Sequence, residues 1–85
     1  MWVLLEGDSN PIRIESDISL VVDLADFKHI LRNELIKLKN IKERDIVFFT
    51  YHDLDTSLPP DTKLQPLADN TTKNEPLIVK YLSQV

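Results

Sequence analysis

The sequence opens with MWVLLEGDSNPIRIE (residues 1–15), which predicts a β-hairpin. Residues 1–6 form an apolar run that ends in a charge, and residues 11–15 alternate apolar and polar side chains as a half-buried strand does. The connection Gly7-Asp8-Ser9-Asn10 is a dense turn signal. Gly7 is the only glycine in the chain, and we expect it to occupy a turn position with a positive φ angle.

One amphipathic helix is predicted after the hairpin, from residue 23 to about residue 40. Apolar residues recur there at intervals of three and four, at Leu24, Phe27, Leu31, Leu35 and Leu38. Residues 45–51 are rich in β-branched and aromatic side chains and predict a third strand. Residues 76–82 predict the last strand. Residues 52–69 are expected to be irregular, because three prolines interrupt them.

This order of elements predicts an α+β domain with one helix packed on one face of a single sheet. We expect a ubiquitin-like β-grasp fold with a mixed sheet of four to five strands. The first and last strands should lie parallel in its centre, because both are nearly all apolar. The predicted core consists of Val3, Leu5, Ile12, Ile14, Phe27, Leu31, Leu35, Val47, Phe49, Leu77 and Val79.

Composition limits the classes of function. The 85 residues, 42% hydrophobic and 28% charged, suit one globular domain over residues 1–85. Ten basic residues are scattered among fourteen acidic ones, for a net charge of −4, which disfavours binding to nucleic acid. The absence of cysteine excludes thiol chemistry. No apolar run approaches the roughly 20 residues that cross a bilayer, so we expect no membrane insertion.

Neither histidine predicts a catalytic or metal site. His29 falls on the expected helix, and His52 precedes Asp53, so a His–Asp pair could belong to a metal site or a triad. We see no third ligand at a useful spacing and no serine in a nucleophile-elbow setting. We therefore expect two solvated histidines and no enzyme activity, cofactor or metal. The competing hypothesis is a small hydrolase or nuclease built on the carboxylates.

A loose acidic group, Asp53, Asp55 and Asp61, lies in the segment expected to be irregular. It could engage a basic partner, as the acidic hairpin of Phox/Bem-type heterodimerisation domains does. Alternatively, these side chains cap turns in a proline-rich loop, and we favour that interpretation.

Strand alternation also predicts an interaction surface on the sheet face opposite the helix. Lys80 and Thr50 are the polar residues of their strands, and we expect both to face solvent. Residues at every second position from them along each strand should lie on the same face. The predicted surface consists of Trp2, Leu4, Ile46, Phe48, Ile78 and Lys80. An apolar patch of this kind marks a partner surface, for another protein or a second copy of the chain. The alternative is that a neighbouring domain or the irregular segment covers it.

The chain resembles the N-terminal domain of Crinkler effectors along nearly its whole length. Residues 2–14, WVLLEGDSNPIRI, resemble the opening strand, Gly-Asp turn and second strand of those proteins. Residues 26–31, DFKHIL, resemble the Asp-Leu-Lys opening of their helix, and residues 46–49 their next apolar strand. LQPL at 64–67 and PLIV at 76–79 are similar to their closing segment. The Leu-Phe-Leu-Ala-Lys motif of the oomycete proteins is absent from this sequence.

The resemblance implies a ubiquitin-like domain that forms the N-terminal module of a larger protein. In that family, which spans oomycetes, fungi and other eukaryotes, variable C-terminal domains carry the activity. The N-terminal domain is associated with secretion or translocation into host cells. The function implied is a non-catalytic module for protein interaction and targeting, secreted and acting in a host cell. The alternative is a cytoplasmic or nuclear ubiquitin-like adaptor or heterodimerisation domain.

Overall fold

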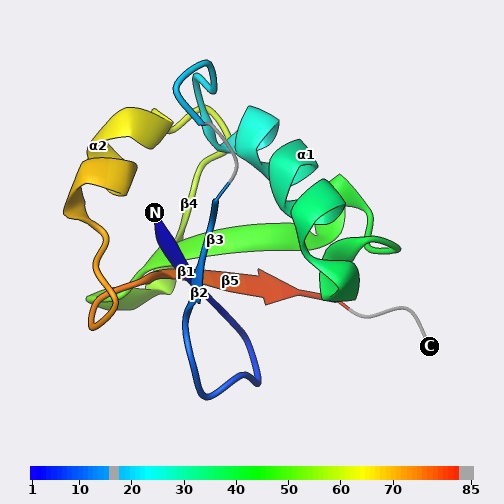
Figure 1. Ribbon diagram of the computed structural model, residues 1–85, viewed down its shortest axis with the longest axis horizontal. Coiled ribbons are helices and arrows are strands. Elements are labelled where there is room, and N and C mark those ends of the chain that lie inside the picture. The colour runs from blue at the N-terminus through cyan, green and yellow to red at the C-terminus, as the bar shows by residue number, and fades with distance from the viewer. Residues whose placement is uncertain (16–17, 83–85) are drawn as a thin grey trace.

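The computed structural model describes residues 1–15 and 18–82, which form a five-stranded sheet covered on one side by helices (Figure 1). The strands, in the order β2-β1-β5-β3-β4, are β1 (Trp2–Leu5), β2 (Ile12–Arg13), β3 (Ile46–Thr50), β4 (Asp53–Leu58) and β5 (Leu77–Tyr81). The helices are α1 (Leu24–Glu34) and α2 (Leu64–Asn70), with 3-10 turns η1 (Ile36–Leu38) and η2 (Glu43–Asp45).

The first and last strands lie side by side in the middle of the sheet and run parallel. Val3 is opposite Leu77, and Leu5 is opposite Val79. The pairs β1–β2, β3–β5 and β3–β4 are antiparallel, which makes the sheet mixed. The predicted fold class is confirmed, since the chain adopts an α+β, ubiquitin-like β-grasp fold.

The core lies between the sheet and the helices. Phe27 of α1 faces Phe48 of β3 with ring centroids 6.0 Å apart, and both side chains are buried. The buried set is Val3, Leu5, Ile14, Leu24, Phe27, Leu31, Leu38, Ile41, Ile46, Phe48, Leu64, Leu77 and Val79. Most of the predicted core is therefore confirmed, while Ile12 and Leu35 pack at its margin. Val47 and Phe49 are only half-buried, and their assignment to the core was wrong.

Helix α1 ends earlier than the apolar pattern predicted. Asp23 caps its first turn by accepting a hydrogen bond from the Asp26 N–H at 3.1 Å. Leu35 then takes an extended conformation and ends the helix. Eleven helical residues span about 16 Å, close to the roughly 17 Å of a five-residue strand. Beyond the helix, η1 places Leu38 in the core, where its side chain is fully buried.

The segment predicted to be irregular contains both β4 and α2. Pro66 is compatible with α2 because it lies in the first turn, where a backbone N–H has no partner within the helix. Leu64 anchors α2 in the core. The chain before α2 is tied to the start of α1, since the Leu24 N–H donates to the Thr62 carbonyl at 3.0 Å.

Polar contacts fix the connection between β1 and β2. Gly7 has φ of +90°, as expected from its turn setting. Lys37 of η1 donates a hydrogen bond to Asp8 Oδ1, and this bond raises the pKa of Lys37 above its ordinary value. The hairpin turn is thereby joined to the segment that follows α1.

We predict that Gly7→Ala destabilises the domain by about 1–2 kcal/mol, because a side chain disfavours a left-handed backbone. A Cβ at Gly7 would meet no atom within 4 Å, so the loss reflects backbone conformation alone. Urea denaturation measures the change, with Ser9→Ala in the same turn as the control. Equal midpoints for the two variants would contradict the prediction.

We predict that Phe27→Ala lowers the free energy of unfolding by about 3–5 kcal/mol, because it leaves a cavity between α1 and β3. The exposed neighbour His29 provides a matched control on the same helix, and His29→Ala should change stability by less than about 0.5 kcal/mol. Chemical denaturation followed by circular dichroism measures both. An unshifted midpoint for Phe27→Ala would overturn the core assignment.

Candidate functional site

The sheet face that points away from the helices presents an apolar surface, which we call the outer face. It consists of Trp2, Leu4, Val47, Phe49, Ile78 and Lys80, all half-buried. The strand register brings them together, because Ile78 lies between Leu4 of β1 and Phe49 of β3. Lys80 lies opposite Val47 in the next row. Three strands therefore contribute to one contiguous surface.

The placement of Trp2, Leu4, Ile78 and Lys80 on this face was predicted correctly, but that of Ile46 and Phe48 was wrong. Both side chains are 1% exposed and lie in the core. The prediction rested on Thr50 facing solvent, and the structure does not place it there. Thr50 lies on the same side of β3 as the core residues, at the end of the strand, where it lines a cavity beneath α2. A polar residue at the end of a strand therefore does not show which face of that strand is exposed to solvent.

The outer face has charged groups at its margin. The Lys80 ammonium lies 4.7 Å from the centre of the Phe49 ring, a cation–π contact that covers part of the ring. A hollow of about 360 Å³ adjoins the ring and is lined by Glu6, Asp45, Val47, Phe49, Lys80, Tyr81 and Leu82. Leu82 is 70% exposed at its rim. The surface thus combines an apolar centre with a partly charged border.

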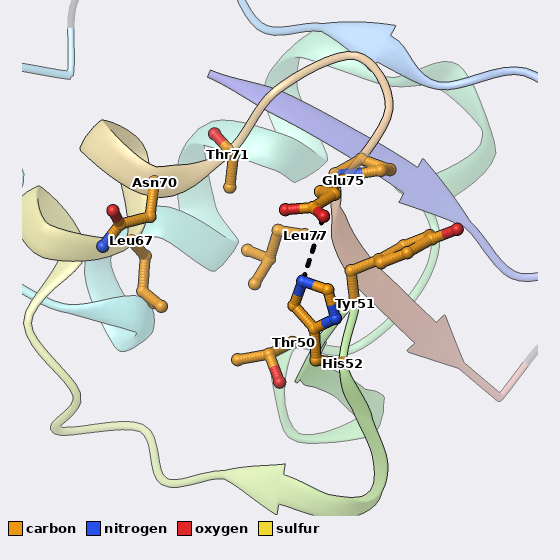
Figure 2. A pocket seen from close by; sticks show the side chains of 9 residues that line it. Thr50, Tyr51, His52, Leu67, Asn70, Thr71, Glu75 and Leu77 are labelled. Carbon is orange, nitrogen blue, oxygen red and sulfur yellow. Dashed lines mark ion pairs between the residues drawn. The ribbon is translucent and has the colours of Figure 1, made fainter.

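A second cavity, of about 190 Å³, lies between α2 and the turn that joins β3 to β4 (Figure 2). We call it the α2 pocket. Its lining residues are Thr50, Tyr51, His52, Leu67, Asn70, Thr71, Glu75, Pro76 and Leu77. At its rim, His52 Nε2 lies 3.2 Å from Glu75 Oε1, and the Tyr51 ring meets His52 edge-on. Sequence patterns do not predict this pocket, because no local pattern links the three segments that line it.

The titratable residues considered from the sequence remain at the surface. His29 and His52 are both exposed, and His52 pairs with Glu75 instead of the neighbouring aspartates. Asp53 Oδ1 accepts hydrogen bonds from the backbone N–H groups of Asp55 and Thr56, each at 3.2 Å. Turn capping is therefore confirmed for Asp53. Asp55 and Asp61 are exposed.

Within residues 1–15 and 18–82, no group of three or more potential metal ligands is present. In the same part of the chain, no helix has the length and apolar character needed to cross a membrane.

Comparisons with known proteins give no significant match to a family model, to a curated protein or to a solved structure.

The register of β3 predicts opposite results for two adjacent substitutions. Phe48→Asp should unfold the domain, because an unpaired carboxylate in the core costs about 4 kcal/mol or more. Phe49→Asp should leave the fold native, because this side chain already meets solvent on the outer face. Circular dichroism and the dispersion of amide NMR signals measure both. A folded Phe48→Asp variant together with an unfolded Phe49→Asp variant would mean that β3 is inverted.

Proposed function

We propose that this domain is a non-catalytic protein-binding module that engages its partner through the outer face. The observation that supports the proposal most directly is the row Leu4–Ile78–Phe49, which is aligned across the three adjacent strands and partly exposed to solvent. Burying apolar area of this kind is favourable by about 25 cal/mol per Å². Aromatic anchors within such a surface tend to carry most of the binding energy. Trp2 and Phe49 are the aromatic side chains of this face.

The border of the outer face favours a protein partner over a nucleic acid. Lys80 contributes a positive charge beside Phe49, while Glu6 and Asp45 contribute negative charges to the adjoining hollow. Mixed charges at the rim favour oriented docking of another folded chain. A phosphate backbone would instead require clustered lysine and arginine. A second copy of the chain is one such partner, since pairing of identical faces is the commonest route to a small oligomer.

The resemblance to Crinkler effectors extends this proposal to targeting. On that basis the domain is the N-terminal module of a larger secreted protein that acts in a host cell. The parent reading frame tests this extension, and we expect it to encode a nuclease-like or kinase-like domain after residue 85. A parent that is a membrane protein or a metabolic enzyme would contradict it and favour an intracellular adaptor.

The binding proposal predicts that Phe49→Asp abolishes association while the fold stays native. The matched control is Ile36→Asp, which adds the same charge at an apolar residue that is 89% exposed and lies in η1. We would measure mass by light scattering over a concentration series, and retention of partners from extracts on the immobilised domain. Wild type and Ile36→Asp should behave alike, and Phe49→Asp should lose both self-association and retention.

Circular dichroism on the same samples separates loss of binding from loss of fold. If folded Phe49→Asp associates and retains partners as the wild type does, the interface lies elsewhere and the proposal is wrong.

A further inference from the structure

We propose that the α2 pocket is a second binding site, which accepts one apolar side chain of a peptide that carries a lysine or arginine next to it. The site lies between α2 and the β3–β4 turn, and its lining shares no residue with the outer face. The inference is independent of the function proposed above.

The size of the cavity selects a single side chain. Pockets for drug-sized ligands and cofactors have volumes of about 300–1,000 Å³. The α2 pocket, at about 190 Å³, is smaller than these. An apolar cavity of about 150 Å³ is enough to hold a benzene ring. The α2 pocket therefore fits one aromatic ring or one branched aliphatic group.

The lining provides an apolar surface for that group. Pro76 and Leu77, the first residue of β5, are buried. Leu67 of α2 borders the same space and is half-buried (Figure 2). Thr50 and Thr71 border the same space and are half-buried as well. Filling the space would remove the exposed parts of Leu67, Thr50 and Thr71 from water, which favours an apolar ligand.

The carboxylate at the rim favours a positively charged residue next to the apolar side chain of the bound peptide. Glu75 is the only carboxylate among the lining residues, and the lining includes no lysine or arginine. Its ion-pair partner, His52, is charged only when protonated, and the two side chains are 72% and 47% exposed. The lining therefore offers one carboxylate and no ammonium or guanidinium group of its own. An ammonium or guanidinium group can replace the imidazole beside Glu75 and form a permanent ion pair.

Hydrogen bonds hold the border of the pocket in place. The Glu75 N–H donates to Thr72 Oγ1 at 3.0 Å, which closes the turn before β5. Thr71 donates its hydroxyl to the Ala68 carbonyl at 3.3 Å, and Asn70 Nδ2 donates to the Pro66 carbonyl at 2.8 Å. A border fixed in this way loses little conformational entropy when a ligand enters.

The test uses short peptides as probes and amide NMR signals of the whole domain as the readout. We would titrate N-acetyl-Leu-Lys-amide, N-acetyl-Leu-Glu-amide and N-acetyl-Gly-Lys-amide. The Leu-Lys peptide should shift the amides of Thr50, Leu67 and Leu77. It should bind about fivefold more tightly than the Leu-Glu peptide, which places a like charge beside Glu75. It should bind about tenfold more tightly than the Gly-Lys peptide, which has no apolar side chain.

Variants assign the effect to the pocket. Glu75→Gln should reduce the preference for Leu-Lys over Leu-Glu to less than about twofold. Asp61→Asn removes an exposed carboxylate outside the lining and should leave the preference unchanged. Phe49→Asp should leave peptide binding intact, which separates this site from the outer face.

Three results would overturn the proposal. They are equal affinity for the Leu-Lys and Leu-Glu peptides, amide shifts confined to the outer face, and loss of peptide binding in folded Phe49→Asp. Each of them is measured without reference to whether the outer face binds protein.

Discussion

The parallel pairing of β1 with β5 is the contact on which the rest of the fold depends. Parallel strands cannot be joined by a tight turn, so the chain between them must cross over the sheet. Helix α1 makes that crossing, and the contact of Phe27 with Phe48 holds it against β3. Because β1 and β5 come from opposite ends of the sequence, their pairing has a large loop-closure cost, which burial of Val3, Leu5, Leu77 and Val79 offsets.

Helix α2 completes the core and also creates a surface. Leu64 closes the core beneath the start of α1, to which the preceding segment is hydrogen-bonded. Farther along α2, Leu67 does not reach full burial, and the space beside it is the α2 pocket. The domain therefore offers two chemically distinct surfaces: a broad apolar sheet face and a small cavity with a carboxylate at its rim.

Sequence patterns correctly predicted the features that are set by residues close together in the chain, or by a strand that is apolar along its whole length. The turn at Gly7, the buried residues Leu24, Phe27 and Leu31 of α1, and the inward side of β1 and β5 were predicted correctly. The β3 register was not, because Thr50 marks the end of the strand and not its outward side. Helix α2 was not predicted, because Pro66 indicated a break in the chain, although a proline in the first turn is compatible with a helix. The α2 pocket is formed by tertiary contacts alone.

The capping of β4 by Asp53 has a consequence for how the molecule behaves at high concentration. β4 is a sheet edge, where free backbone groups can template the addition of strands from other chains. The Asp53 carboxylate occupies the N–H groups of Asp55 and Thr56, and the register of β4 against β3 is irregular. At the opposite edge, β2 has only two residues in its ladder. Both edges therefore offer few free backbone groups for pairing with a strand of another chain.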